Sequence, residues 1–153
     1  MTAWALGPNE PIQELFPRLQ SVDDDIPERA SHFLSQAIES LHAPSGAIML
    51  CGSAIDAMLK IKGYKSGSLY SRIDQAATDN LITSGMAQWA HQIRLDANDE
   101  RHADENAPLP NEEDAKRCIS FATALGEFLF VLPARVTRGL KESETKNTAP
   151  KGK

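Results

Sequence analysis

Apolar residues recur every three or four positions along most of the chain, which is the spacing of helices with one buried face. No segment alternates strictly between apolar and polar residues, as a half-buried β-strand would. The pattern therefore predicts an all-α protein. We expect an up-and-down helical bundle of four core helices plus one or two short extra helices.

Capping and helix-breaking residues indicate where the predicted helices begin and end. Pro27 suits the first turn of the first helix, and Gly63 closes the second, which has so few polar positions that we expect it to be the most buried. Ser84 is placed to cap the fourth helix and Asn111 the fifth, which we expect Pro133 to stop. The predicted helices cover residues 27–41, 44–62, 68–80, 84–97 and 112–132.

Both ends of the chain differ from the middle. Residues 1–25 contain several prolines and predict an irregular lead-in with a short helix around Ile12 to Leu19. Residues 26–138 hold the helical domain. Residues 139–153 are polar and poor in apolar side chains, so we expect a disordered tail.

Length and charge narrow the class of protein. The 153 residues suit a single domain with its own core. The formal net charge of −5 argues against a protein that coats nucleic acid through bulk electrostatics, although it leaves room for a small local site. The N-terminal residues do not resemble a signal peptide, and no apolar run approaches the ~20 residues that a membrane span needs. We expect a cytoplasmic protein that binds no membrane.

The cysteines support this location. Cys51 and Cys118 are the only two, and each lies within an apolar helical pattern. Free cysteines are among the most buried residues, and nothing resembles a redox CxxC motif, so two reduced core thiols are favoured over a disulfide.

The candidate chemistry lies in the stretch IRLDANDERHAD, where Arg94, Asn98 and His102 follow one another at intervals of four. On a helix they share one face, with Arg94 and His102 ~12 Å apart along the axis. Alternatively, the helix ends near Asn98 and a turn brings His102 back. In either arrangement a guanidinium, an amide and an imidazole lie on one surface.

These groups suit RNA cleavage without a metal. His102 can act as general acid or base near neutral pH, Arg94 can hold the phosphate and stabilise its developing charge, and Asn98 can position either. The alternative is an ordinary surface, on which Arg94 pairs with a nearby acid, Asn98 caps the helix and His102 is solvated. His91, one turn before Arg94, can extend the site. No His or Cys pair has metal-ligand spacing, so we expect neither a metal nor another cofactor.

The last predicted helix has apolar residues on all sides near its end. Phe128, Phe130, Val131 and Leu132 exceed what one core-facing stripe requires. We therefore expect this end to pack against a second copy of the chain.

Three segments together resemble a known family: GAIMLCGSAIDAMLKIKG, the stretch from Ser68 to Asp104, and NEEDAKRCISFATALGEFLFVLPARV. They are similar to uncharacterised bacterial helical domains, found alone or fused to restriction-enzyme subunits, that are related to the HEPN superfamily (higher eukaryotes and prokaryotes nucleotide-binding). The resemblance spans roughly Ile26 to Val136 and implies a four-helix bundle with a metal-independent ribonuclease site at a homodimer cleft. Carried over, Arg94 would grip phosphate, His102 would be the acid or base, and Asn98 the polar helper.

The spacing departs from the active pattern of that superfamily, because seven residues separate Arg94 from His102 and the apolar Leu95 follows Arg94. Two functions therefore stay open. One is binding or cleavage of RNA or nucleotides in bacterial or phage defence, and the other is a non-catalytic protein–protein interaction module that recruits a partner from a defence system.

Overall fold

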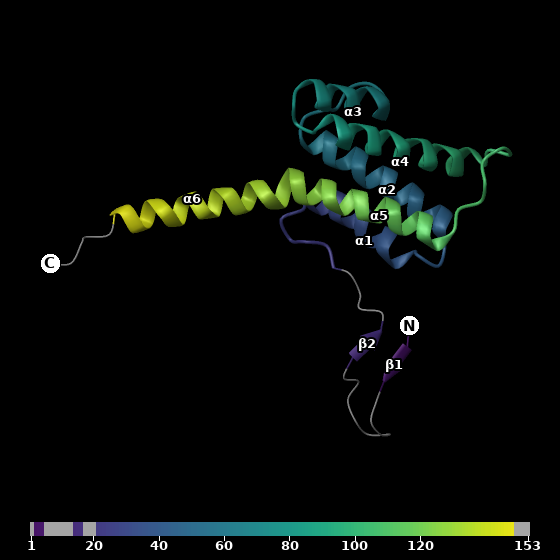
Figure 1. The fold of residues 1–153 in the computed structure, drawn as a ribbon, viewed down its shortest axis with the longest axis horizontal. Coiled ribbons are helices and arrows are strands. Elements are labelled where there is room, and N and C mark those ends of the chain that lie inside the picture. The colour runs from purple at the N-terminus through teal and green to yellow at the C-terminus, as the bar shows by residue number, and fades with distance from the viewer. Residues whose placement is uncertain (1, 5–13, 17–20, 149–153) are drawn as a thin grey trace.

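Four long helices build the bundle of the computed structural model, which describes residues 2–4, 14–16 and 21–148 (Figure 1). They are α1 (Glu28–Glu39), α2 (Pro44–Ile61), α4 (Ser84–His102) and α5 (Glu112–Gly126). The short helix α3 (Leu69–Thr78) lies against α4 and touches α2. The predicted all-α bundle of four core helices with a short extra helix is confirmed.

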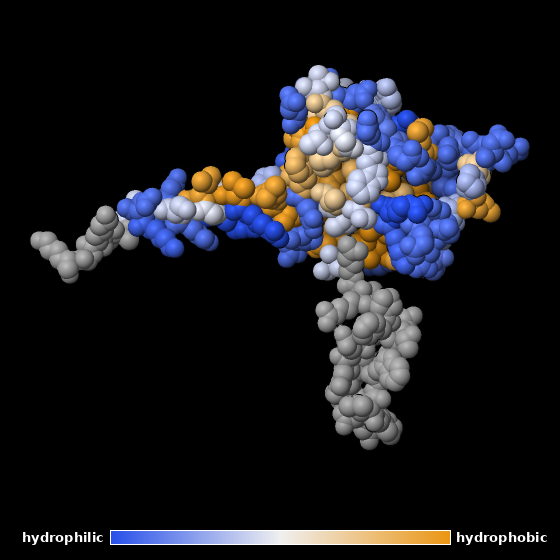
Figure 2. All heavy atoms as spheres, in the orientation of Figure 1, coloured by the Kyte–Doolittle hydropathy of each residue, from blue (hydrophilic) through white to orange (hydrophobic). Residues whose placement is uncertain are grey.

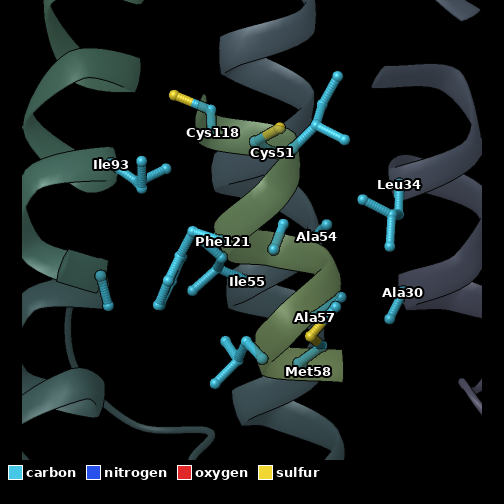
Figure 3. Packing of buried hydrophobic residues seen from close by; sticks show 14 of the residues in the cluster. Ala30, Leu34, Cys51, Ala54, Ile55, Ala57, Met58, Ile93, Cys118 and Phe121 are labelled. Atoms are coloured by element: carbon cyan, nitrogen blue, oxygen red, sulfur yellow. The ribbon is translucent and has the colours of Figure 1, made fainter. Parts of the chain in front are cut away.

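Helix α2 is the central element, as its lack of polar positions predicts, and it packs against α1, α3, α4 and α5. Leu34 of α1, Ile93 of α4 and Phe121 of α5 lie in the same core as Ile55 of α2, and all four side chains are fully buried (Figure 3). This arrangement leaves the outer faces of α3 and α4 free to carry polar side chains.

Some helix ends carry the predicted residues, whereas Pro27 is the N-cap that precedes α1 and does not lie in its first turn. Asn111 caps α5 in a reciprocal capping box: its side chain accepts from the Asp114 amide at 3.0 Å, and Asp114 accepts from the Asn111 amide at 2.8 Å. Thr83, rather than Ser84, caps α4 by accepting from the Met86 amide. Helix α4 continues to His102 and ends at Ala103, which adopts a left-handed conformation. Of the two geometries considered for the site, the uninterrupted helix is the one observed.

Pro133 does not stop the last helix, so that prediction is wrong. A π-helical turn, η1 (Glu127–Val131), follows α5 directly and leads into α6 (Leu132–Thr148), which projects away from the bundle (Figure 1). Pro133 falls in the first turn of α6, where a missing amide is tolerated. Residues 139–148, expected to be disordered, are helical, and the rest of the predicted tail lies outside the described residues.

The N-terminal region forms strands instead of the expected short helix. Strands β1 (Thr2–Trp4) and β2 (Glu14–Phe16) pair antiparallel, with Ala3 opposite Leu15. The helix predicted around Ile12 to Leu19 is therefore wrong for Glu14–Phe16, whose backbone pairs with another strand; the remainder of that prediction lies outside the described residues.

The two thiols lie in the core, as predicted. Cys51 of α2 and Cys118 of α5 are free and buried. Burial raises the pKa of Cys118 to about 12, and burial raises the pKa of Cys51 further.

The helical run Glu112–Thr148 is long and apolar enough to span a membrane, judged by length and composition alone. The core helix of a soluble protein passes the same test, and the α5 part of this run supplies core residues.

Candidate functional site

Arg94 lies on the side of α4 that faces α3. Its guanidinium carbon is 5.3 Å from the centre of the Tyr70 ring, which belongs to α3 and is 52% exposed. Among residues 21–148, Arg94 forms no ion pair, and its Nε atom is buried without a hydrogen-bond partner. The alternative in which Arg94 pairs with a neighbouring acid is therefore not what the structure shows. Arg94 makes a cation–π contact with an aromatic ring instead.

His91 joins this contact from the preceding turn of α4. Its Nε2 lies 2.8 Å from Oδ1 of Asp74 on α3, and its ring centre is 4.8 Å from that of Tyr70. Nδ1 of His91 is buried and has no partner within the described chain. We call Tyr70, Asp74, His91 and Arg94 the α3–α4 cluster.

Helical spacing on two neighbouring helices produces the cluster. Ser68 caps α3 by accepting from the Ser71 amide, so the helix begins just before Tyr70. Tyr70 and Asp74 are four residues apart and therefore lie on one face of α3. His91 and Arg94 are three residues apart on the facing side of α4, so the two pairs meet where the helices pack.

Asn98 and His102 lie further along α4 and outside the cluster. Both are exposed, and neither has a side-chain hydrogen bond or ion pair in the part of the chain that the structure describes. Asn98 is not the C-cap, because Ala103 holds that position. Since α4 is continuous, Arg94 and His102 remain ~12 Å apart along the axis. The catalytic roles of Arg94, Asn98 and His102 stay a prediction.

The acidic residues near Arg94 turn toward another side of α4. Asp96, Asp99 and Glu100 line a hollow of about 400 Å³ between α4 and α5, together with Trp89 and Asp114. None of Arg94, Asn98 and His102 lines this hollow. Asp96, Asp99 and Glu100 thus face away from the α3–α4 cluster, and the carboxylate within the cluster, that of Asp74, lies 2.8 Å from Nε2 of His91.

Sequence reasoning singled out Arg94 and noted His91 but missed Tyr70 and Asp74. Their partners lie 24 and 17 positions away along the chain, so no short motif contains the cluster. Within the described residues, no group of three or more His, Cys, Asp or Glu side chains is placed to hold a metal ion.

Comparison with protein families gives a match over most of the chain. A family model described as "Domain of unknown function (DUF4145)" matches residues 17–143, most of the chain. No curated protein and no solved structure matches significantly.

Proposed function

The chain belongs to the DUF4145 family, and from that premise we propose that it binds single-stranded RNA or nucleotides through the α3–α4 cluster, without a metal. The observation that supports this proposal is the cation–π contact between Arg94 and the exposed ring of Tyr70. The family description names no activity, so the proposal rests on this geometry and on the resemblance described above.

Aromatic rings and arginines are the groups with which proteins hold unpaired bases. The exposed part of Tyr70 offers a surface on which a base can stack, worth about 1–3 kcal/mol per base. The guanidinium of Arg94 carries a fixed positive charge and planar N–H donors that suit a phosphate. The Asp74–His91 pair bridges α3 and α4 next to the ring and holds its surroundings in place. Binding therefore requires only the cluster.

Cleavage requires His102 as well. In one copy of the chain, His102 lies at the far end of α4 from the cluster, so a phosphate gripped by Arg94 would be attacked only if RNA follows the helix or a second copy supplies the imidazole. In that reaction, the ribose 2′-oxygen attacks the adjacent phosphorus, the 5′-oxygen leaves, and a cyclic phosphate forms. Binding is the function that the geometry supports best, and cleavage is a further step.

Binding can be tested with a short, fluorescently labelled single-stranded RNA and the full chain, by anisotropy at fixed salt in excess chelator. We expect Tyr70→Ala and Arg94→Ala each to weaken binding about tenfold, the equivalent of about 1.4 kcal/mol. Arg94→Lys keeps the charge but loses the planar guanidinium, so its affinity for RNA should fall between those of the wild type and Arg94→Ala. Arg117→Ala, which removes an exposed arginine from α5, is the matched control. No binding by the wild type, or wild-type affinity in both alanine variants, would refute the proposal.

The same samples test cleavage. Product carrying a cyclic phosphate is expected from the wild type in chelator, with loss of product in Arg94→Ala and His102→Ala. His91→Ala distinguishes the imidazole held by Asp74 from the exposed one at residue 102. Cleavage that persists in all three variants would place the activity elsewhere.

A second candidate function, an interaction and assembly module, is favoured by the surface of the projecting helix. Phe128 of η1 and Leu132, Val136 and Leu140 of α6 are 39%, 52%, 53% and 62% exposed and follow one another at intervals of four. Figure 2 shows apolar atoms along one side of the projecting helix and polar atoms along the other. We propose that this apolar stripe joins two copies of the chain, and its test is given in the Discussion.

The cellular setting is proposed on the resemblance and on composition. We infer a cytoplasmic protein of a bacterial or phage defence system, with no membrane association and with a protein partner from that system.

A further inference from the structure

A second hollow, of about 390 Å³, opens on the outer side of α1 and α2. Its volume falls within the range of small-molecule sites. It shares no residue with the α3–α4 cluster. The lining residues are Arg29, Phe33, Ser53, Asp56, Ala57, Lys60, Ile61 and Lys65.

The hollow is positively charged, although the chain as a whole has a net charge of −5. Three cationic side chains line it, from α1 (Arg29), from α2 (Lys60) and from the loop after α2 (Lys65), against the single carboxylate of Asp56. That carboxylate is already bound twice, by Nζ of Lys60 at 2.6 Å and by Arg72 at 2.6 Å. An anion entering the hollow therefore meets an excess of positive charge.

Arg72 anchors the loop that carries Lys65. Its side chain is only 12% exposed and donates to both Asp56 and the carbonyl of Gly67, each at 2.6 Å. Gly67 has a φ of 79°, a conformation that favours glycine. The two hydrogen bonds hold the loop that carries Lys65 against α2, so Lys65 is presented to the hollow by an anchored segment.

An apolar wall completes the hollow. Phe33 packs partly against the core, and Ile61 is 42% exposed. Ser53 donates its hydroxyl to the Met49 carbonyl, which leaves its oxygen able to accept. A ligand that uses the whole lining needs both a compact anion and an apolar or aromatic group.

We propose that this hollow binds a small organic phosphate monoester. Its phosphate contacts Arg29, Lys60 and Lys65, and its ring or apolar group lies on Phe33 and Ile61. A monoester carries about −1.5 to −2 charges at neutral pH, which matches a site with several cations better than a singly charged backbone phosphate does. The guanidinium of Arg29 adds the bidentate geometry that phosphate favours.

Calorimetric titration of the full chain, in buffer free of phosphate, tests the site with three probes. Phenyl phosphate is expected to bind more tightly than inorganic phosphate, because only the former reaches the apolar wall. Phenol, which lacks the charge, is expected to give no measurable binding. The absence of binding by phenyl phosphate would overturn the proposal.

Variants locate the binding. Arg29→Ala and Lys65→Ala should each weaken the binding of phenyl phosphate about tenfold, because each removes a charge-assisted hydrogen bond to the phosphate. Both side chains are exposed, so their removal leaves the core intact. Phe33→Leu should reduce the difference in affinity between phenyl phosphate and inorganic phosphate, because it removes the aromatic surface from the hollow. Lys116→Ala, on α5 and paired with Glu113, is the control and should bind as the wild type. Wild-type affinity in both Arg29→Ala and Lys65→Ala would refute this location.

The result is independent of RNA binding. Lys65→Ala leaves Tyr70 and Arg94 unchanged, so it should retain the affinity for labelled RNA, and phenyl phosphate should not displace that RNA. Displacement would show that the two ligands share one site and would overturn the proposal of a separate one.

Discussion

Cys51 and Cys118 show how burial controls the chemistry of single side chains in this protein. Both thiols lie in the core between α2 and α5, and burial raises the pKa of each above its ordinary value of 9.0. Because a thiol reacts as its thiolate, neither is available for redox chemistry or metal binding near neutral pH.

The raised pKa values predict a loss of stability at alkaline pH. Below about pH 9, the thiols are protonated in both the folded and the unfolded state and contribute no pH dependence. Above it, the unfolded thiol ionises while the folded Cys118 keeps its proton up to about pH 12, so the free energy of unfolding falls as pH rises. The expected loss is about 1 kcal/mol per thiol between pH 9 and pH 10.

Urea unfolding at these two pH values measures the effect. Cys118→Ala lowers stability at both values because it leaves a cavity, but its further loss from pH 9 to pH 10 should be smaller than that of the wild type. An identical loss in both proteins would contradict the prediction.

Residues were predictable where their partners are close in sequence. The Asn111–Asp114 capping box follows from a spacing of three, and the core position of the cysteines follows from the apolar positions around them. The contact between Arg94 and Tyr70 was not predictable, because it depends on how α3 packs against α4. The choice of Thr83 over Ser84 as a cap depends on backbone angles that adjacent hydroxyl residues do not reveal.

At the scale of elements, α2 and α4 approach closely at Gly52. A methyl group at this position would lie 2.9 Å from Cβ of Ala97, closer than side chains normally pack. A Cβ atom is fixed to the backbone and cannot rotate away, so the two helices would have to separate.

Gly52→Ala should therefore destabilise the fold by about 1–2 kcal/mol, the overpacking penalty less the gain in helix propensity. Gly46→Ala, in the same helix but with no atom within 4 Å of the added methyl, should be neutral or stabilising by up to about 1 kcal/mol. The two variants are compared by the denaturant concentration at the midpoint of unfolding, with the slope of the free energy of unfolding against denaturant unchanged. Equal stability of the two variants would mean that the helices are not in contact at Gly52.

The last helix shows where element prediction fails. Its apolar spacing and its start were correct, but Pro133 was expected to end it. The π turn before Pro133 places that residue in the first turn of a new helix, and periodicity based on 3.6 residues per turn does not detect such a change.

At the scale of the whole molecule, every helix except α6 contributes buried residues to the core. Helix α6 has no buried residue in its described length. A helix with an apolar face and no covering partner is marginal in water by itself. A second copy packed on Phe128, Leu132, Val136 and Leu140 would cover that face.

We therefore expect light scattering at micromolar concentration to give a dimer mass for the wild type. Leu132→Glu and Val136→Glu should shift the mass toward the monomer, because each places a charge within the apolar stripe. Thr145→Glu is the matched control: Thr145 is exposed on α6, ~180° around the helix from Val136, and should leave the dimer intact. A monomer mass for the wild type would contradict both the dimer and a composite RNA-cleavage site.

The π turn also determines where this helix directs its side chains. In η1 (Glu127–Val131), backbone hydrogen bonds close one residue later than in an α-helix. Deleting a single residue there would rotate the downstream helix by ~100° about its axis, so that Leu132, Val136 and Leu140 would face a different side of the molecule. The length of one short turn, and not the identity of those three residues, thus decides which way a docking partner would have to approach.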